Sequence, residues 1–179
     1  MKTLVNLFLA VFFSSLFLSS CRKPKADTNN ATEYFVKYKL NGVLVTNTSS
    51  NHIWLQPNGS DPSKTDLMLV STTNDFKNSI GITIQKTGAI DQGAYQFGNN
   101  SYIISADYFK DQGTTNEKIY TVENGPGNPP CVFTINYTSI TNSDFRGTFS
   151  GNYFYGTSGT NPNETISITD GEFWVKRNP

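Results

Sequence analysis

The stretch FTINYT at residues 133–138 alternates large apolar side chains with polar ones. The apolar positions therefore share one face of an extended chain, and this period of two predicts a β-strand with one buried side. Two other stretches repeat the pattern: IGITIQ at residues 80–85, and FRGTFSGNYFY at residues 145–155, where glycines occupy two of the inward positions. No run of ten residues in the same region shows a helical stripe, so the pattern indicates an all-β protein.

Turn signals separate these stretches at intervals of about eight to twelve residues, as in sandwiches and barrels. Asn41-Gly42 predicts a type I′ hairpin, because both central residues of that turn need positive φ. The segment GPGNPP at 125–130 is a loop, and Asn161-Pro162-Asn163 predicts a turn. We interpret Asp170-Gly171 as a bulge in one long strand over 164–176, with a tight hairpin as the alternative. Further strands are expected at 34–40, 43–46, 52–56, 66–73, 94–97, 102–109 and 118–122.

The predicted fold is an antiparallel β-sandwich of about ten strands, because strands that each bury one face can pack as two layers. A closed, lipocalin-like barrel is the alternative, since the sequence does not reveal how the strands are staggered.

The N-terminus predicts export and lipid attachment. Lys2 precedes an apolar run over residues 4–18, and small residues then lead to Cys21. This is the layout of a secretory signal peptide, and its end resembles a bacterial lipobox, which implies acylation of the Cys21 thiol and cleavage before it. The run is shorter than the roughly twenty residues of a spanning helix. An ordinary signal peptide with a free cysteine, or a retained transmembrane helix, are the alternatives.

The expected organisation is therefore a lipoprotein signal peptide at 1–20, a lipidated cysteine and flexible tether at 21–32, and one β-sandwich domain at 33–179. The tether has no large apolar side chain with which to offset its ordering entropy. Its basic residues Arg22, Lys23 and Lys25 lie beside the expected lipid and can interact with an anionic surface.

Composition excludes some functions. The chain has 14 basic and 14 acidic residues, and no basic stripe suggests nucleic-acid binding. It has two cysteines, so acylation of Cys21 leaves Cys131 without an intrachain partner. Cys131 shares the parity of the apolar face of 133–137, and we interpret it as a small buried hydrophobe.

Several of these features together resemble small lipoproteins of Bacteroidota that belong to families of unknown function. They are the lipobox, the polar tether, the Asn41-Gly42 turn, the stretch GTFSG at 147–151 and the stretch ITDGEF at 168–173. The resemblance implies a location in the cell envelope, anchored by lipid at the outer membrane, and an all-β fold. In that phylum an acidic stretch after the acylated cysteine accompanies export to the cell surface. The basic residues here favour a periplasm-facing orientation.

Catalytic and metal-binding patterns are weak, and we expect no enzyme, cofactor or metal. His52 is the only histidine, and its position beside Trp54 indicates a half-buried strand residue rather than a general base. The serine in GTFSG is misplaced for a nucleophile elbow. Asp170 and Glu172 could form a glycosidase pair, but acids at turns are common on protein surfaces. Clustered His and Cys ligands for zinc are absent from the sequence.

The remaining expectation is a non-catalytic binding or structural module. Its partners are the membrane, through the lipid, and a glycan or an envelope protein. Aromatic residues make up 13% of the chain, and the candidates for stacking on sugar rings are Trp54, Trp174 and Tyr102. A partner can also engage the loops at 58–64, 111–117 and 125–130. The alternatives are a surface glycan-binding lipoprotein, which needs exposed rings, and a lipocalin-like carrier, which needs an internal apolar cavity.

Overall fold

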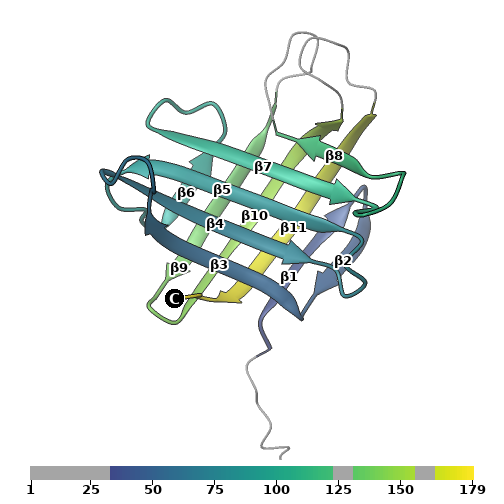
Figure 1. Cartoon of the computed structure of the whole chain (residues 1–179), viewed down its shortest axis with the longest axis horizontal. Helices are drawn as coiled ribbons and strands as arrows, with labels where there is room; N and C mark the ends of the chain where they lie inside the picture. The colour runs from purple at the N-terminus through teal and green to yellow at the C-terminus, as the bar shows by residue number, and fades with distance from the viewer. Residues whose placement is uncertain (1–32, 123–130, 156–163) are drawn as a thin grey trace, which may run out of the picture. The chain divides into compact units, whose positions relative to one another are not determined.

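The computed structural model describes residues 33–122, 131–155 and 164–179 (Figure 1). Every regular element in these residues is a strand, which confirms the predicted all-β, antiparallel fold. Residues Tyr34–Pro179 form one compact unit. The strands are β1 (Phe35–Leu40), β2 (Val43–Asn47), β3 (Ser50–Pro57), β4 (Lys64–Thr72), β5 (Ser79–Thr87), β6 (Gly93–Gln96), β7 (Tyr102–Lys110), β8 (Lys118–Thr121), β9 (Phe133–Ile140), β10 (Asp144–Tyr155) and β11 (Glu164–Lys176).

The described strands form one eleven-stranded sheet that folds over itself into two layers. Its path runs β2-β1-β11-β10-β8-β7-β5-β4-β3, while β9 pairs with β10 and β6 pairs with β9. The front layer contains β3, β4, β5, β7 and β8, and the back layer contains β2, β1, β11, β10, β9 and β6. In Figure 1 the front strands run across the view and the back strands run diagonally behind them. This crossing is typical of orthogonally packed sheets.

Among the described residues, backbone pairing joins the layers at two seams. At one, Phe154 of β10 pairs with Thr121 of β8. At the other, Ile53 of β3 forms a parallel bridge with Arg177, and the Asn178 backbone N–H donates to the Ile53 carbonyl at 2.8 Å. The domain therefore has the two layers of the predicted sandwich, and its sheet is nearly closed, as in the alternative barrel.

The predicted hairpin and bulge are both confirmed. Asn41 and Gly42 have φ values of 49° and 85°, as a type I′ turn requires. β11 is one strand from Glu164 to Lys176, so the tight hairpin is not formed. Its register against β10 slips between the pairs Phe149–Gly171 and Gly151–Ile168, and the inserted Asp170 has a φ of 51°. The bulge bends β11 across the back layer.

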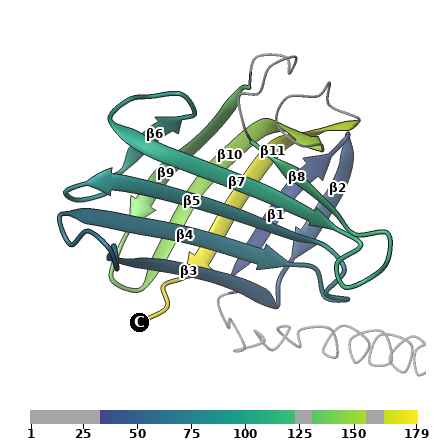
Figure 2. The same ribbon diagram turned by 45° about the horizontal axis from the view of Figure 1, so that its top comes forward.

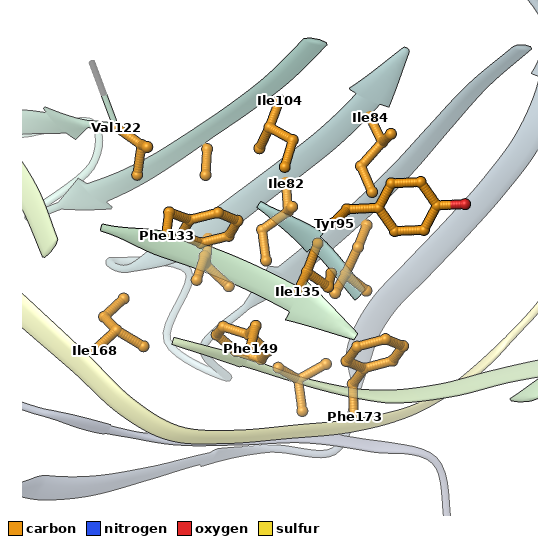
Figure 3. Close-up of a cluster of buried hydrophobic side chains, with 14 of the residues drawn as sticks. Ile82, Ile84, Tyr95, Ile104, Val122, Phe133, Ile135, Phe149, Ile168 and Phe173 are labelled. Atoms are coloured by element: carbon orange, nitrogen blue, oxygen red, sulfur yellow. The ribbon is translucent and has the colours of Figure 1, made fainter. Parts of the chain in front are cut away.

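Inward side chains from both layers fill the space between them. Figure 3 shows Ile82 and Ile104 of the front layer facing Phe149 and Ile135 of the back layer. The alternation predicted for 80–85, 133–138 and 145–155 therefore describes the core, and Cys131 packs against its edge, half-buried. Among the described residues, no helix is long and apolar enough to cross a membrane.

Candidate functional site

An open groove lies on the outer face of the back layer, across β9, β10 and β11. Its volume is about 580 Å³. We call it the back groove, and it is lined by Thr134, Thr148, Phe149, Ser150, Thr169, Asp170, Gly171 and Glu172. A second hollow of about 240 Å³ continues it towards β1 and is lined by Phe35, Thr138, Arg146, Gly147, Thr148, Glu172, Phe173 and Trp174. The two hollows share Thr148 and Glu172, so together they form one elongated depression.

The strand alternation explains why polar groups line the back groove. β9, β10, β11 and β1 run side by side in the back layer (Figure 2). Because Ile135, Phe149 and Phe173 point into the core, their neighbours point outward. Thr148 is paired with Glu172 on one side and with Asn136 on the other, so polar side chains stand in a row across the strands.

The acidic groups of the back groove are held in place by lysines of β1. Lys37 Nζ lies 2.7 Å from a Glu172 carboxylate oxygen, and Lys39 Nζ lies 2.9 Å from a carboxylate oxygen of Asp170. Each pair is half-exposed, so it adds little stability. Its effect is to neutralise the acid locally and to fix an acceptor beside the hydroxyl groups of the groove.

Trp174 forms the aromatic end of the depression. It is paired with Phe35 of β1 on one side and with Arg146 of β10 on the other. The Arg146 guanidinium carbon lies 4.0 Å from the Trp174 ring centroid, and Tyr34 meets the indole edge-on at 5.5 Å. A cation and an aromatic ring therefore hold the indole in one orientation on the outer face of the sheet.

The three predicted aromatic candidates do not meet in one place. Trp174 belongs to the back layer, whereas Trp54 lies on the outer face of β3 and lines a separate hollow with Gln56, Asp66 and Met68. Tyr102 lies at the start of β7, where its hydroxyl accepts a hydrogen bond from the Gln96 backbone N–H at 2.8 Å. Its ring packs edge-on against Tyr95, with centroids 5.0 Å apart.

Some predicted features fall outside the described residues, namely Cys21, the loop at 125–130 and the turn at 161–163. The other two candidate loops are structured by their own polar groups. Asn58 Oδ1 accepts the backbone N–H groups of Ser60 and Asp61, and the backbone N–H of Gly113 donates to a Glu117 carboxylate oxygen at 2.7 Å.

The expectation that His52 is half-buried is wrong. Its side chain is exposed, because β3 presents this position to the outer face next to Trp54. The two rings stack with centroids 5.5 Å apart, and His52 Nδ1 lies 3.2 Å from Asn178 Nδ2. Burial raises the pKa of the Cys131 thiol to about 11, so it is protonated at neutral pH. In the part of the chain that the structure describes, no three His, Cys, Asp or Glu side chains cluster to hold a metal.

The sequence interpretation missed the hydroxyl groups of the back groove. Thr134, Thr148, Ser150 and Thr169 occupy the polar positions of strands that were assigned for their apolar faces. The signal is the concentration of small hydroxyl residues on the outward parity of three neighbouring strands. It becomes visible once the order of the strands is known.

Comparison of the chain with protein-family models, with curated proteins and with solved structures finds no match.

Proposed function

We propose that this chain is a non-catalytic binding module of the cell envelope, anchored by lipid at Cys21, and that it binds glycan chains in the back groove. The observation that carries the proposal is the shape and lining of that groove. It is long and open, it combines hydroxyl and carboxylate groups, and it ends at Trp174. Sugars offer many hydroxyl groups and apolar ring faces, and this lining can satisfy both.

The local charge favours a neutral glycan over an anionic one. Lys37 and Lys39 compensate Glu172 and Asp170. The third cation of the depression, Arg146, has a carboxylate oxygen of Asp144 3.6 Å from its Nε, so each cation has an acidic neighbour and little net positive charge is left to attract a polyanion. The carboxylate oxygens accept hydrogen bonds from sugar hydroxyls, and charged acceptors make stronger hydrogen bonds than neutral ones. The threonine and serine hydroxyls can donate or accept, which suits a ligand with many similar groups.

The non-catalytic part of the proposal is supported by the surroundings of the one histidine. His52 contacts Trp54 and Asn178, and neither residue is a nucleophile. The Cys131 thiol lies beside the backbone carbonyl of Asn152, at 4.0 Å. A triad would need a base within hydrogen-bond reach of a serine or cysteine.

Binding is tested with the chain from Arg22 onward, which keeps every described residue. Neutral and anionic polysaccharides are titrated against it and against Thr148→Val, which keeps the strand shape but removes one hydroxyl. We expect the variant to bind a neutral polysaccharide about fivefold more weakly, as for one lost hydrogen bond. Thr83→Val, on the outer face of β5, is the matched control and should bind normally. Equal binding by all three proteins would refute the groove assignment.

The anchor is tested separately in cells. Fractionation should find the unsubstituted chain in the membrane fraction and Cys21→Ala in the soluble fraction. In intact cells we expect the domain to lie on the periplasmic side of the membrane. Mass spectrometry should find an acylated N-terminal cysteine at position 21. An unmodified mature N-terminus at another residue would contradict the anchor while leaving the glycan site untouched.

A further inference from the structure

The front layer carries a separate hollow that the proposed function does not use. It opens between β3 and β4 on the outer face, and its volume is about 200 Å³. We call it the front pocket, and it is lined by Trp54, Gln56, Asp66 and Met68. In the register of the sheet, Trp54 is paired with Met68, and Gln56 is paired with Asp66. An apolar pair therefore stands directly beside a polar pair.

The stacking of His52 determines which face of Trp54 is available. His52 and Gln56 flank Trp54 on the same side of β3, two residues before and two residues after it. The His52 ring covers one indole face, with an angle of 24° between the planes. The opposite face is therefore directed towards Gln56, which is where the front pocket lies. One flat aromatic face is open to a ligand while the ring is supported from behind.

The polar side of the front pocket is pre-organised. Asp66 accepts a hydrogen bond on one carboxylate oxygen from Asn58 Nδ2 at 2.8 Å, and on the other from Gln85 Nε2 at 3.1 Å. These two donors come from opposite sides of β4 and fix the plane of the carboxylate. Each oxygen keeps a further lone pair. The Gln56 amide, exposed beside it, supplies both a donor and an acceptor.

We infer that the front pocket binds a single pyranose ring, independently of the back groove. The apolar C–H face of the sugar lies on the free face of Trp54, with Met68 at the edge. Two neighbouring hydroxyl groups meet the Asp66 carboxylate and the Gln56 amide. Pockets that combine an aromatic wall with a few fixed polar groups bind ligands of this kind. The small volume fits one ring, whereas the elongated back groove fits a chain.

The two tryptophans of the sequence make a direct experiment possible. In Trp174→Phe, all tryptophan emission comes from Trp54. This variant, in the chain from Arg22 onward, is titrated with glucose, galactose, mannose and N-acetylglucosamine, each as its methyl glycoside. We expect at least one to give a saturable change in emission. Adding Gln56→Ala should weaken that binding about fivefold or more. The reciprocal variant Trp54→Phe, which reports from Trp174, should show no saturable change with the same monosaccharides.

Asp66→Asn is the second test variant, because it keeps the shape of the pocket and its amide can still meet Gln85. It should weaken binding about tenfold while the protein remains folded by circular dichroism. Affinities for free monosaccharides and for short oligosaccharides are then compared. Equal affinities mean that the pocket recognises one ring, and a higher affinity for the oligosaccharides means that it recognises the end of a chain. If no glycoside gives a saturable change, or if Gln56→Ala and Asp66→Asn bind as well as their parent, the inference is wrong. Thr148→Val in the back groove should leave this signal unchanged, so the two sites can fail separately.

Discussion

The two layers bury different kinds of side chain against each other. The front layer contributes mainly aliphatic groups, among them Ile80, Ile82 and Ile84 of β5, and Leu67 and Leu69 of β4. The back layer contributes mainly aromatic rings, with glycines among its inward positions. Its rings in the core are those of Tyr38, Tyr95, Phe133, Tyr137, Phe145, Phe149, Tyr153 and Phe173. An aliphatic face can form a layer without glycine, whereas an aromatic face needs space for its rings.

The glycines of the back layer supply that space. A Cβ on Gly147 would collide with the backbone oxygen of Asn136 and would lie 2.5 Å from Cζ of Phe173. A Cβ on Gly171 would collide with the Phe149 carbonyl and would lie 2.8 Å from its ring. Phe173 and Phe149 therefore each cover a glycine on the neighbouring strand, as in designed sheets where an aromatic residue shields a strand glycine. Gly81 of β5 lies on the outer face of the front layer, between the buried Ile80 and Ile82, and a Cβ there would meet nothing within 4 Å.

The largest expected effect comes from adding one methyl group to the back layer. Gly147→Ala should lower the free energy of unfolding by about 3 kcal/mol, because backbone as well as a ring must move. Gly81→Ala is the matched control and should be neutral or slightly stabilising, since alanine costs less backbone entropy than glycine in a strand. Urea unfolding of both variants measures the difference. If Gly147→Ala and Gly81→Ala unfold at the same urea concentration, the back layer can accommodate a Cβ at Gly147 and the explanation by close contact is wrong.

The next prediction concerns a hydrogen-bonded link between the layers. Asn47 of β2, in the back layer, is 1% exposed, and its Nδ2 donates to Ser71 Oγ of β4 at 2.7 Å. Ser71 Oγ donates in turn to Asn51 Oδ1 of β3 at 2.7 Å, and Asn51 Nδ2 donates to the Asn47 carbonyl at 2.9 Å. The network closes on itself and fixes the sharp turn of the chain from one layer to the other.

Removing one member should therefore destabilise both layers together. Asn47→Ala should cost about 2 kcal/mol, because it leaves a buried polar group without its partner. Ser49→Ala is the control, since its hydroxyl donates to Asn74 on the surface and should cost about 0.5 kcal/mol or less. Thermal unfolding of the two variants gives the comparison. If Ser49→Ala loses as much stability as Asn47→Ala, the buried network does not contribute specifically to holding the layers together.

The strands could be predicted from the sequence because alternation is a local signal. The isoleucines of β5, the hairpin at Asn41-Gly42 and the bulge at Asp170 each depend on a few consecutive residues. The two seams could not be predicted. Phe154 with Thr121, and Ile53 with Arg177, are single pairs between distant residues, and no local pattern marks them.

For the candidate sites, too, the sequence predicts what depends on neighbouring residues and misses what depends on distant ones. Strand alternation alone puts Trp174 and Phe173 on opposite sides of β11, and the structure shows Trp174 on the outer side. The back groove required knowledge of which strands are neighbours, because Thr134 and Thr169 come from β9 and β11 with β10 between them. Similarly, the free face of Trp54 depends on the conformation of His52, which no sequence pattern fixes.

A smaller effect, of opposite sign, is expected for two buried tyrosines of the back layer, one with and one without a hydrogen-bond partner for its hydroxyl. The Tyr137 hydroxyl is buried and has no hydrogen-bond partner among the described residues, and burial raises its pKa well above the ordinary value. Tyr137→Phe should therefore be neutral or stabilise by up to about 1 kcal/mol. Tyr95 accepts the Asp91 backbone N–H at 3.0 Å and donates to the Asp91 carbonyl at 2.9 Å, so Tyr95→Phe should cost about 1 kcal/mol. Chemical denaturation resolves both, and a matching loss in Tyr137→Phe would indicate a bound water at its hydroxyl.

The smallest effect is expected on the outer face of the back layer. Lys37 and Glu172 are 41% and 48% exposed, so their 2.7 Å ion pair is screened by water. Lys37→Met should change the free energy of unfolding by about 0.5 kcal/mol or less, at low and at high salt. The same variant leaves Glu172 uncompensated in the back groove, so it should alter glycan binding more than stability, and should weaken any binding of an anionic polysaccharide. Stability and binding measured on one preparation separate the two roles. A large loss of stability would mean that these charges hold the sheet together rather than shape its surface.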